Sequence, residues 1–226
     1  YICKLGVVMA DFTWSFSALK TYQNCPRRYY EENVTKNFKQ KPTQATIYGN
    51  AVHNALEKYV RDGEPLPKYY ERFKKDVDAL LEIPGEKLTE HRMGLTRDLS
   101  PCGYGEDIRW VRGIADLVIV DGDYAFIIDY KTGSDKYPDL KQLRLMSHMT
   151  FAHFPQVKKI KAALLFLMNS NFMPEEYVRE DIPKSWDNFK VPLTRLENSL
   201  DTNTWTPTPN PLCRFCPVTT CEFNKS

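Results

Sequence analysis

The chain has 226 residues, of which 42% are hydrophobic, enough to form the core of one sizeable domain. With 31 basic and 29 acidic residues, its formal net charge is only +2. This balance excludes a strong field over the whole protein, so any polyanion must be bound locally. No apolar run approaches the roughly 18 residues of a membrane span, and we expect a cytoplasmic protein without a membrane partner.

The first part of the chain predicts helices. A short helix is expected to begin at Ser15 or Ser17. It is interrupted around Cys25-Pro26, because proline is tolerated only in the first turn of a helix, and it resumes over residues 27–32. Two longer segments, 45–63 and 66–85, have apolar residues at helical spacing, and each ends at a glycine. The sequence begins at Tyr1, so we assign no role to residues 1–8 and take Met9 as a candidate natural start.

After residue 85 the hydrophobic period becomes strand-like. Segments 107–120 and 124–133 are rich in β-branched and aromatic residues, and the Asp-Gly pair between them predicts a hairpin. The expected elements that follow are a helix at about 139–154, a buried strand at 158–169, an edge strand at 175–182 and a helix at 185–200. Helices on both sides of a short mixed sheet predict an α/β domain.

The hairpin should bring three charged side chains together. A two-residue turn at 121–122 places Asp116, Asp129 and Lys131 on one face, because side chains alternate and paired residues share a face. A turn at 122–123 keeps the three together and makes the two aspartates direct neighbours, whereas a three-residue loop sends Asp116 to the other face. We expect the turn at 121–122.

Two carboxylates held so close repel each other unless positive charge lies between them, and a divalent cation is the usual solution. Lys131 can then orient or activate the attacking water or stabilise charge on a phosphate. The alternative interpretation is a pair of surface acids with an ion-paired lysine. The apolar flanks "GIADLVIV" and "AFII" disfavour a solvated face.

These residues resemble a known family. "RGIADLVIVDGDYAFIIDYKTG" is similar to the core of the PD-(D/E)xK nuclease superfamily, and specifically to its RecB-like exonuclease branch. "YGNAVHNALE" resembles the Gly-x-x-x-His helix of that branch, and "FSALKTYQNCPRRYY" resembles its opening Cys-Pro element. The resemblance implies a restriction-endonuclease-like core with a central mixed β-sheet flanked by helices, a helical N-terminal region and a C-terminal cysteine staple.

The implied organisation is a single nuclease domain over residues 1–226. Its parts would be a helical N-terminal part at 11–84, a catalytic sheet with helices at 86–200, and a cysteine-rich tail at 201–226 that packs with Cys25.

The resemblance also implies site residues. The metal ligands would be His53, Asp116, Asp129 and the backbone carbonyl of Tyr130. Lys131 would act on the attacking water, and Glu90 would match an acidic position on the strand before the hairpin. Gln142 matches the glutamine of the next helix, but Met146 replaces the tyrosine usually found four residues later, which casts doubt on an aromatic DNA contact there.

The residues by themselves leave alternatives open. His53 shares one side of its helix with apolar residues, where a histidine is more often a hydrogen-bonded core residue. Gln142 could serve only to cap or bridge. We interpret His91, His148 and His153 as structural, because no motif supports a ligand role for them.

Three of the six cysteines form a C-x2-C-x4-C pattern from residue 213 to residue 221, in an irregular segment where they can converge on one ion or cluster. The spacing alone favours zinc. The resemblance to those RecB-like nucleases that contain iron-sulfur clusters implies a 4Fe-4S cluster instead. A cluster that binds both Cys25 and the cysteines of the tail would close a long loop of the chain. This closure would restrict the unfolded chain by on the order of 5 kcal/mol, so a structural role is enough to account for the cysteines. Cys3 and Cys102 are interpreted as free thiols. The four ligands would be Cys25, Cys213, Cys216 and Cys221.

Phosphodiester hydrolysis suits this set of residues, with Mg²⁺ or Mn²⁺ as the catalytic ion. Basic and aromatic clusters such as "CPRRYYEEN" and "NFKQK" could follow a DNA strand, while "KKIK" is more simply the solvated start of a strand. The resemblance implies a metal-dependent DNA exonuclease of recombination, repair or replication, acting on single strands or duplex ends. Two alternatives stay open: a nuclease that trims DNA before CRISPR integration, and a non-cutting DNA-binding module with a zinc staple.

Overall fold

The structure, a computed structural model, describes residues 12–225, so Cys3 and Met9 lie outside the described residues. The chain divides into two compact units. One is the continuous segment Pro42–Ser185, and the other combines the described parts of Tyr1–Lys41 and Trp186–Ser226. Within the described residues, no helix combines the length and the apolar character needed to cross a membrane.

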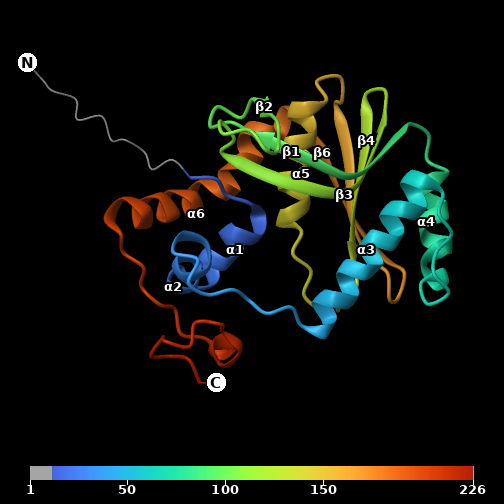
Figure 1. The fold of residues 1–226 in the computed structure, drawn as a ribbon. Coiled ribbons are helices and arrows are strands. Elements are labelled where there is room, and N and C mark those ends of the chain that lie inside the picture. Colours follow the sequence, from blue (N-terminus) through green and yellow to red (C-terminus); the bar gives the residue numbers. More distant parts are fainter. Residues whose placement is uncertain (1–11, 226) are drawn as a thin grey trace, which may run out of the picture. The chain divides into compact units, whose positions relative to one another are not determined.

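A six-stranded mixed sheet forms the centre of the continuous unit (Figure 1). The strands lie in the order β2-β1-β3-β4-β5-β6, with β4 and β5 parallel and every other neighbouring pair antiparallel. The sheet and its flanking helices confirm the expected α/β, restriction-endonuclease-like fold. The strands are β1 (Glu86–Leu95), β2 (Pro101–Cys102), β3 (Val111–Asp121), β4 (Tyr124–Lys131), β5 (Lys159–Phe166) and β6 (Asn171–Val178).

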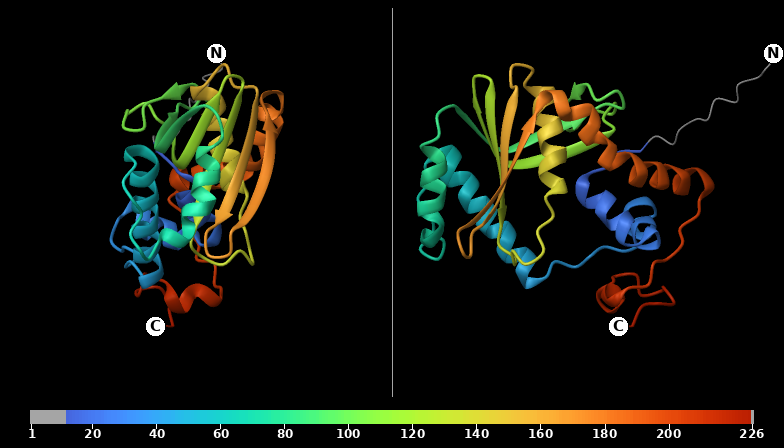
Figure 2. Two further views of the ribbon diagram at one scale, coloured as in Figure 1. Left: turned by 90° about the vertical axis from the view of Figure 1, so that its right-hand side faces the viewer. Right: turned by 180° about the vertical axis from the view of Figure 1, so that it is seen from behind.

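Helices cover both faces of this sheet (Figure 2). α3 (Gln44–Asp62) and α4 (Lys74–Leu81) lie on one face, and α5 (Lys141–His153) lies on the other, where it connects the parallel strands β4 and β5. α3 ends at Gly63, whose φ of 69° is a conformation that glycine adopts without a steric penalty. α4 is shorter than the expected helix 66–85, because residues 64–73, which include two prolines, form only a turn and one 3₁₀ turn.

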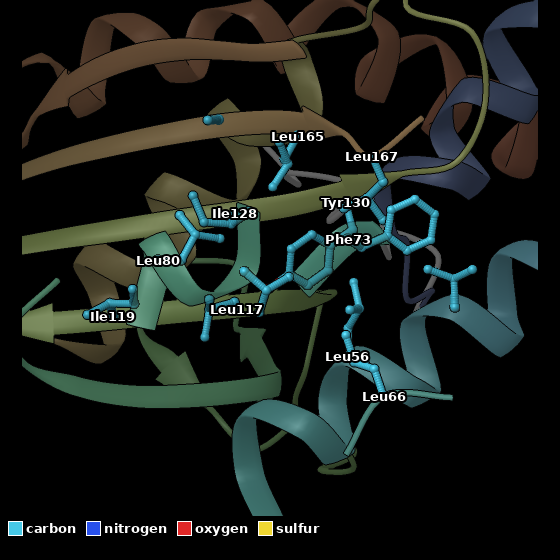
Figure 3. Close-up of a cluster of buried hydrophobic side chains, with 13 residues drawn as sticks. Leu56, Leu66, Phe73, Leu80, Leu117, Ile119, Ile128, Tyr130, Leu165 and Leu167 are labelled. Atoms are coloured by element: carbon cyan, nitrogen blue, oxygen red, sulfur yellow. The ribbon is translucent and has the colours of Figure 1, made fainter. Parts of the chain in front are cut away.

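The apolar sides of α3 and α4 pack on β3, β4 and β5 in one buried cluster (Figure 3). Leu56, Phe73 and Leu117 are fully buried there. Tyr130 also belongs to the cluster. Because side chains alternate along a strand, the residues on either side of Tyr130 point away from the cluster. A strand anchored in the core therefore ends by presenting an acid and a lysine.

The β3–β4 hairpin turns one residue later than expected. Its two turn residues are Gly122 and Asp123, since Asp121 pairs with Tyr124. Gly122 has a φ of 57°, and glycine is favoured at this position of a tight hairpin turn. The expected register is therefore wrong, and the weighed alternative is observed. Continued along the strands, this register sets Asp116 directly opposite Asp129.

Two further strands differ from the sequence prediction. β1 has no alternating apolar pattern, and only the family resemblance implied a strand there. It is held by antiparallel pairing with β3 along almost its whole length. β6 begins at Asn171 rather than at 175, because it pairs with the full length of β5, and it ends at Val178 before a 3₁₀ turn.

The discontinuous unit joins the beginning and the end of the chain. α1 (Phe16–Asn24) begins after Ser15, which accepts the Ala18 N–H, and the helix breaks at Cys25 as predicted. Trp205 stacks on Tyr29 and Tyr30, with ring centroids 5.9 and 5.0 Å apart. This aromatic stack fastens the tail to the first helices. The other elements are α2 (Pro26–Tyr29), a π-helical turn (Tyr30–Val34), a 3₁₀ helix (Pro211–Phe215) and most of α6 (Ile182–Thr202).

Candidate functional site

Three ligand-type side chains from three elements converge at the middle of β3, next to the C-terminal end of β4. They are His53 of α3, Glu90 of β1 and Asp116 of β3, and each offers one ligand atom within 4.8 Å of the others. In the described part of the chain, no other trio of histidine, cysteine or acidic side chains comes this close. The trio matches the donor set of a divalent cation that accepts both oxygen and imidazole ligands.

Asp116 is held from two sides. Its Oδ2 accepts the Tyr130 N–H at 2.7 Å, and its Oδ1 lies 3.3 Å from Nδ1 of His53. The regular β3–β4 pairing ends at Leu117, so the carboxylate accepts the strand N–H at the point where the ladder stops. The backbone of β4 thus fixes the aspartate before any ion binds.

Glu90 reaches the trio through an unusual backbone conformation. Its φ is 45°, although it lies within a strand, and non-glycine residues seldom adopt this region. Thr89 and His91 pair with β3 on either side of it, and the same register sets Glu90 opposite Asp116. Such a conformation costs on the order of 1–3 kcal/mol and persists where the surroundings enforce it, often at functional sites.

A second group adjoins the trio. Gln142 of α5 donates its Nε2 to Asp129 Oδ1 at 2.7 Å and accepts from Lys131 Nζ at 3.2 Å. Lys131 Nζ also lies 2.5 Å from Asp129 Oδ2. The three side chains therefore form a closed triangle, in which the amide fixes both the acid and the lysine. Only 5% of Asp129 is exposed, whereas 33% of the Lys131 side chain reaches solvent.

The electrostatics of the site indicate an excess of negative charge. Burial raises the pKa of Asp129 to about 6, and the charge of Asp116 adds to this, although Lys131 and His53 oppose it. Burial and Asp116 also raise the pKa of Glu90. For His53, burial lowers the pKa, but the surrounding acids, Asp116 above all, raise it more. A cation bound among these side chains would lower all three pKa values.

The structure brings together every side chain that the sequence analysis placed in the catalytic or catalytic-metal site. It also shows the role of the side chain that stands where the resemblance implied a tyrosine on α5. Met146 is only 3% exposed, and its Cε occupies the space that a Cβ on Gly113 would need. The glycine of the Gly-x-x-Asp motif therefore gives α5 room to approach the sheet, and the side chain at 146 is used for packing. The set is His53, Glu90, Asp116, Asp129, Lys131 and Gln142.

One acid was not singled out from the sequence. Glu57 lies one helical turn after His53, and its charge contributes to the raised pKa of Glu90. The i, i+4 spacing on α3 was the available signal. The histidines interpreted as structural lie outside the trio: His148 Nε2 is 3.0 Å from Ser185 Oγ, and His153 Nε2 is 2.9 Å from the Gly94 carbonyl oxygen.

The four cysteines of the predicted staple line one cavity of the discontinuous unit, and none of them forms a disulfide. Thr208 N–H lies 3.4 Å from Cys25 Sγ, and Asn210 N–H lies 3.3 Å from Cys213 Sγ. Burial raises the pKa of Cys216, and the neighbouring Cys25 contributes to the increase. Backbone N–H groups thus point at thiols that converge from both ends of the chain.

The spacing of these thiols bears on what they could hold. Zn–S bonds of about 2.3 Å in a tetrahedral site require sulfurs roughly 3.8 Å apart. Within residues 12–225, no three thiols lie within 4.8 Å of one another. A tetrahedral zinc site would therefore require these thiols to move closer together.

Comparisons with known proteins agree with this architecture. Residues 13–221 match the family profile described as the PD-(D/E)XK nuclease superfamily. A solved structure of a protein from Eubacterium rectale, which carries a provisional designation as an exonuclease, is similar with a TM-score of 0.53 and 10% identity. That match covers 93% of this chain and 86% of the other.

A second solved structure, that of SSO0001, is similar with a TM-score of 0.49 and 17% identity, over 98% of this chain and 92% of that one. No protein of curated function matches the sequence.

Proposed function

Since the chain belongs to the PD-(D/E)XK nuclease superfamily, we propose that it is a metal-dependent DNA exonuclease that hydrolyses phosphodiester bonds. The observation that carries the proposal is the convergence of His53, Glu90 and Asp116 within 4.8 Å, next to a lysine held by an acid and an amide. Metal-assisted hydrolysis is expected of a site in which several carboxylates lie close to a histidine and a lysine.

The trio fits a divalent ion by both chemistry and charge. His53, Glu90 and Asp116 would hold Mg²⁺ or Mn²⁺, and the imidazole among oxygen ligands favours Mn²⁺. Asp129 and the backbone carbonyl of Tyr130 are proposed as further ligands. When bound, such an ion neutralises charge on phosphate oxygens and makes water a stronger nucleophile.

The protein's own groups have separate tasks in this proposal. The Tyr130 N–H keeps Asp116 oriented, and Gln142 keeps Asp129 and Lys131 in place. The partly exposed ammonium of Lys131 orients the attacking water or stabilises the charge that develops on the phosphate. Removal of the ammonium should therefore impair the chemical step more than the binding of the metal.

The exonuclease mode and the DNA substrate are the finer parts of the proposal. The similarity of the Gly-x-x-Asp and Asp-Tyr-Lys-Thr-Gly segments to RecB-like exonucleases supports them, as does the provisional designation of the Eubacterium rectale protein that shares the fold. Recombination, repair and replication are the processes that use such enzymes in that branch.

We further propose a structural 4Fe-4S cluster in the cysteine cavity. It would link the two chain segments of the discontinuous unit, and the N–H contacts to two thiols suit a group that carries negative charge. Anaerobic purification tests this proposal: a brown protein with four irons per chain supports it, and a colourless protein with one zinc contradicts it. The proposed ligands are Cys25, Cys213, Cys216 and Cys221.

The main test is digestion of end-labelled and circular DNA with Mn²⁺, by wild type and by Lys131→Ala. We expect the wild type to shorten linear DNA from its ends and to spare circles, with activity abolished by EDTA. Lys131→Ala should fall by about 10²–10⁴-fold, whereas Lys158→Ala, an exposed lysine on the same unit, should not change. Equal, metal-independent background from all three proteins would support a non-cutting DNA-binding module instead. Products of one defined length would support a nuclease that trims DNA before CRISPR integration.

A further inference from the structure

The loop of residues 132–140 joins the two elements that carry the active-site lysine and glutamine. β4 ends at Lys131, and α5 begins one residue before Gln142. We propose that Tyr137, near the middle of this loop, stacks on an unpaired base next to the cleaved bond and makes single-stranded DNA ends the preferred substrate. This inference rests on the proposed nuclease function and assigns the substrate class of the same site.

Tyr137 is unusual in its exposure. It is 84% exposed, although tyrosine usually buries its ring and leaves only the hydroxyl in water. Lys136 Nζ lies 5.4 Å from the centroid of its ring. An exposed aromatic ring with a cation over one face still offers its other face to a base and the cation to a phosphate, a combination that single-strand-binding surfaces use.

The loop that presents this ring is tethered. The Asp135 carboxylate accepts from Asn169 Nδ2 at 2.8 Å and from Asn171 Nδ2 at 2.7 Å, which fastens the loop to the β5–β6 turn and to the first residue of β6. Pro138 follows Tyr137 and restricts the tyrosine backbone to extended conformations. The exposed ring is therefore carried on a restrained segment, so binding costs less ordering entropy than on a free loop.

The loop keeps the ring near the reacting groups. Both of its ends lie at the active site, because Lys131 Nζ contacts Gln142 Oε1 at 3.2 Å. Tyr137 is five residues before Gln142, so even a fully extended chain would place its Cα no more than about 18 Å from that of the glutamine. The exposed Lys141 lies on the same stretch. A strand that runs from the site along this loop would meet the ring.

A base can stack on this ring only if it is free of its own neighbours. In duplex DNA the bases are paired and stacked, and freeing one costs a few kcal/mol. Stacking on a protein aromatic contributes roughly 1–3 kcal/mol per base, which does not generally exceed that cost. The geometry therefore favours an unpaired end over a blunt duplex end.

The test compares the wild type with Tyr137→Ala, Tyr137→Phe and Tyr69→Ala. Tyr69 is the matched control, since it is 86% exposed but lies on the segment before α4. We expect Tyr137→Ala to raise KM for a single-stranded oligonucleotide by about 5- to 100-fold, with little change for a blunt duplex. Tyr137→Phe and Tyr69→Ala should match the wild type. A single abasic nucleotide, moved along the oligonucleotide, should weaken the wild type at one position and leave Tyr137→Ala unaffected there.

Binding of the same oligonucleotides, measured by anisotropy in EDTA, separates this inference from the proposed function. If no protein cleaves DNA but only Tyr137→Ala loses affinity, the nuclease proposal fails and the stacking role stands. If the wild type cleaves DNA and Tyr137→Ala has an unchanged KM and affinity, the stacking role is wrong. A wild type that neither cleaves nor binds single-stranded DNA overturns both.

Discussion

The carboxylate site and the cysteine cavity differ in what holds their ligands in place. Asp116 and Asp129 are fixed by a strand N–H at 2.7 Å and by an amide N–H at 2.7 Å, on elements that belong to the sheet. The thiols Cys25 and Cys213 accept longer N–H contacts of 3.3–3.4 Å, and Cys213 lies in the 3₁₀ helix of the tail.

This difference indicates two relations between metal and fold. A site that hydrogen bonds and a packed sheet already organise should persist without its ion. Ligands that come from the two ends of the chain and are held only weakly should instead depend on the group they bind, whose binding free energy then contributes to folding. Removal of the metal ion should therefore abolish activity at the carboxylate site without unfolding it. Removal of the group bound by the cysteines should unfold the discontinuous unit.

Loss of a ligand of the proposed 4Fe-4S cluster should have the largest effect. Cys216→Ala should abolish the visible absorbance of the cluster and destabilise the discontinuous unit by on the order of 5 kcal/mol, because the long cross-link between chain ends is lost. Hydrogen exchange should show lost protection in α1 and α6 and retained protection in β3 and β4. Cys102→Ala, a free buried thiol in β2, is the control and should keep the cluster. Unchanged protection in α1 would contradict the dependence.

Removal of one carboxylate charge should inactivate the carboxylate site without unfolding the continuous unit. Asp116→Asn should reduce DNA degradation at least 100-fold and abolish the stabilisation by Mn²⁺, which for the wild type should reach about 2.7 kcal/mol at 100 times the Kd. Asp121→Asn, an exposed acid at the far end of the same strand, is the control. Thermal unfolding with and without Mn²⁺ measures the effect, and an Asp116→Asn protein that is still stabilised by Mn²⁺ would exclude this site.

A pH titration can show whether acid lowers the free energy of unfolding of the continuous unit through a group outside the metal site. Burial, with a contribution from Arg144, lowers the pKa of His148 to about 4, against about 6.5 in an unfolded chain. As the pH falls below 6.5, the unfolded chain binds a proton that the folded chain excludes, so stability falls until about pH 4. The loss should be on the order of 2–3 kcal/mol by pH 4.5.

His148→Gln removes this contribution and should show a smaller loss of stability between pH 7 and pH 4.5. Urea unfolding of both proteins at the two pH values measures the difference. Equal losses in the two proteins would show that His148 does not carry the acid sensitivity.

The smallest effect is expected from the residue that only positions others. Gln142→Met keeps the length of the side chain but removes its hydrogen bonds to Asp129 and Lys131, so kcat should fall about 10-fold. The stabilisation by Mn²⁺ should remain, because the trio is intact. A kcat equal to that of the wild type would show that the triangle does not set the lysine position.

Much of the fold and site could be predicted because the signals are local. The alternation of apolar residues around Asp129 and Lys131, the break at Cys25-Pro26 and the cysteine spacing are short-range patterns with direct structural consequences. The face shared by Asp116 and Asp129 could be expected in either two-residue register, since both preserve the alternation of side chains. The register itself depended on whether Gly122 took the first or the second turn position.

The remaining features depend on tertiary contacts that leave little trace in the sequence. β1 is rich in charged residues and is a strand because β3 pairs with it, and the positive φ of Glu90 has no signature in an acidic residue. The packing of Met146 against Gly113 follows from the approach of α5 to the sheet. That Cys25 lines one cavity with the three cysteines of the tail could be seen only after the four thiols had been placed.

The proposed function depends on His53, Glu90 and Asp116 holding one divalent ion at the reacting centre. Anomalous scattering at the manganese edge, from crystals of the protein soaked in Mn²⁺, can locate that ion. We expect a peak within bonding distance of all three side chains. A peak bound elsewhere, or a trio that stays empty while Mn²⁺ supports DNA degradation, would contradict it.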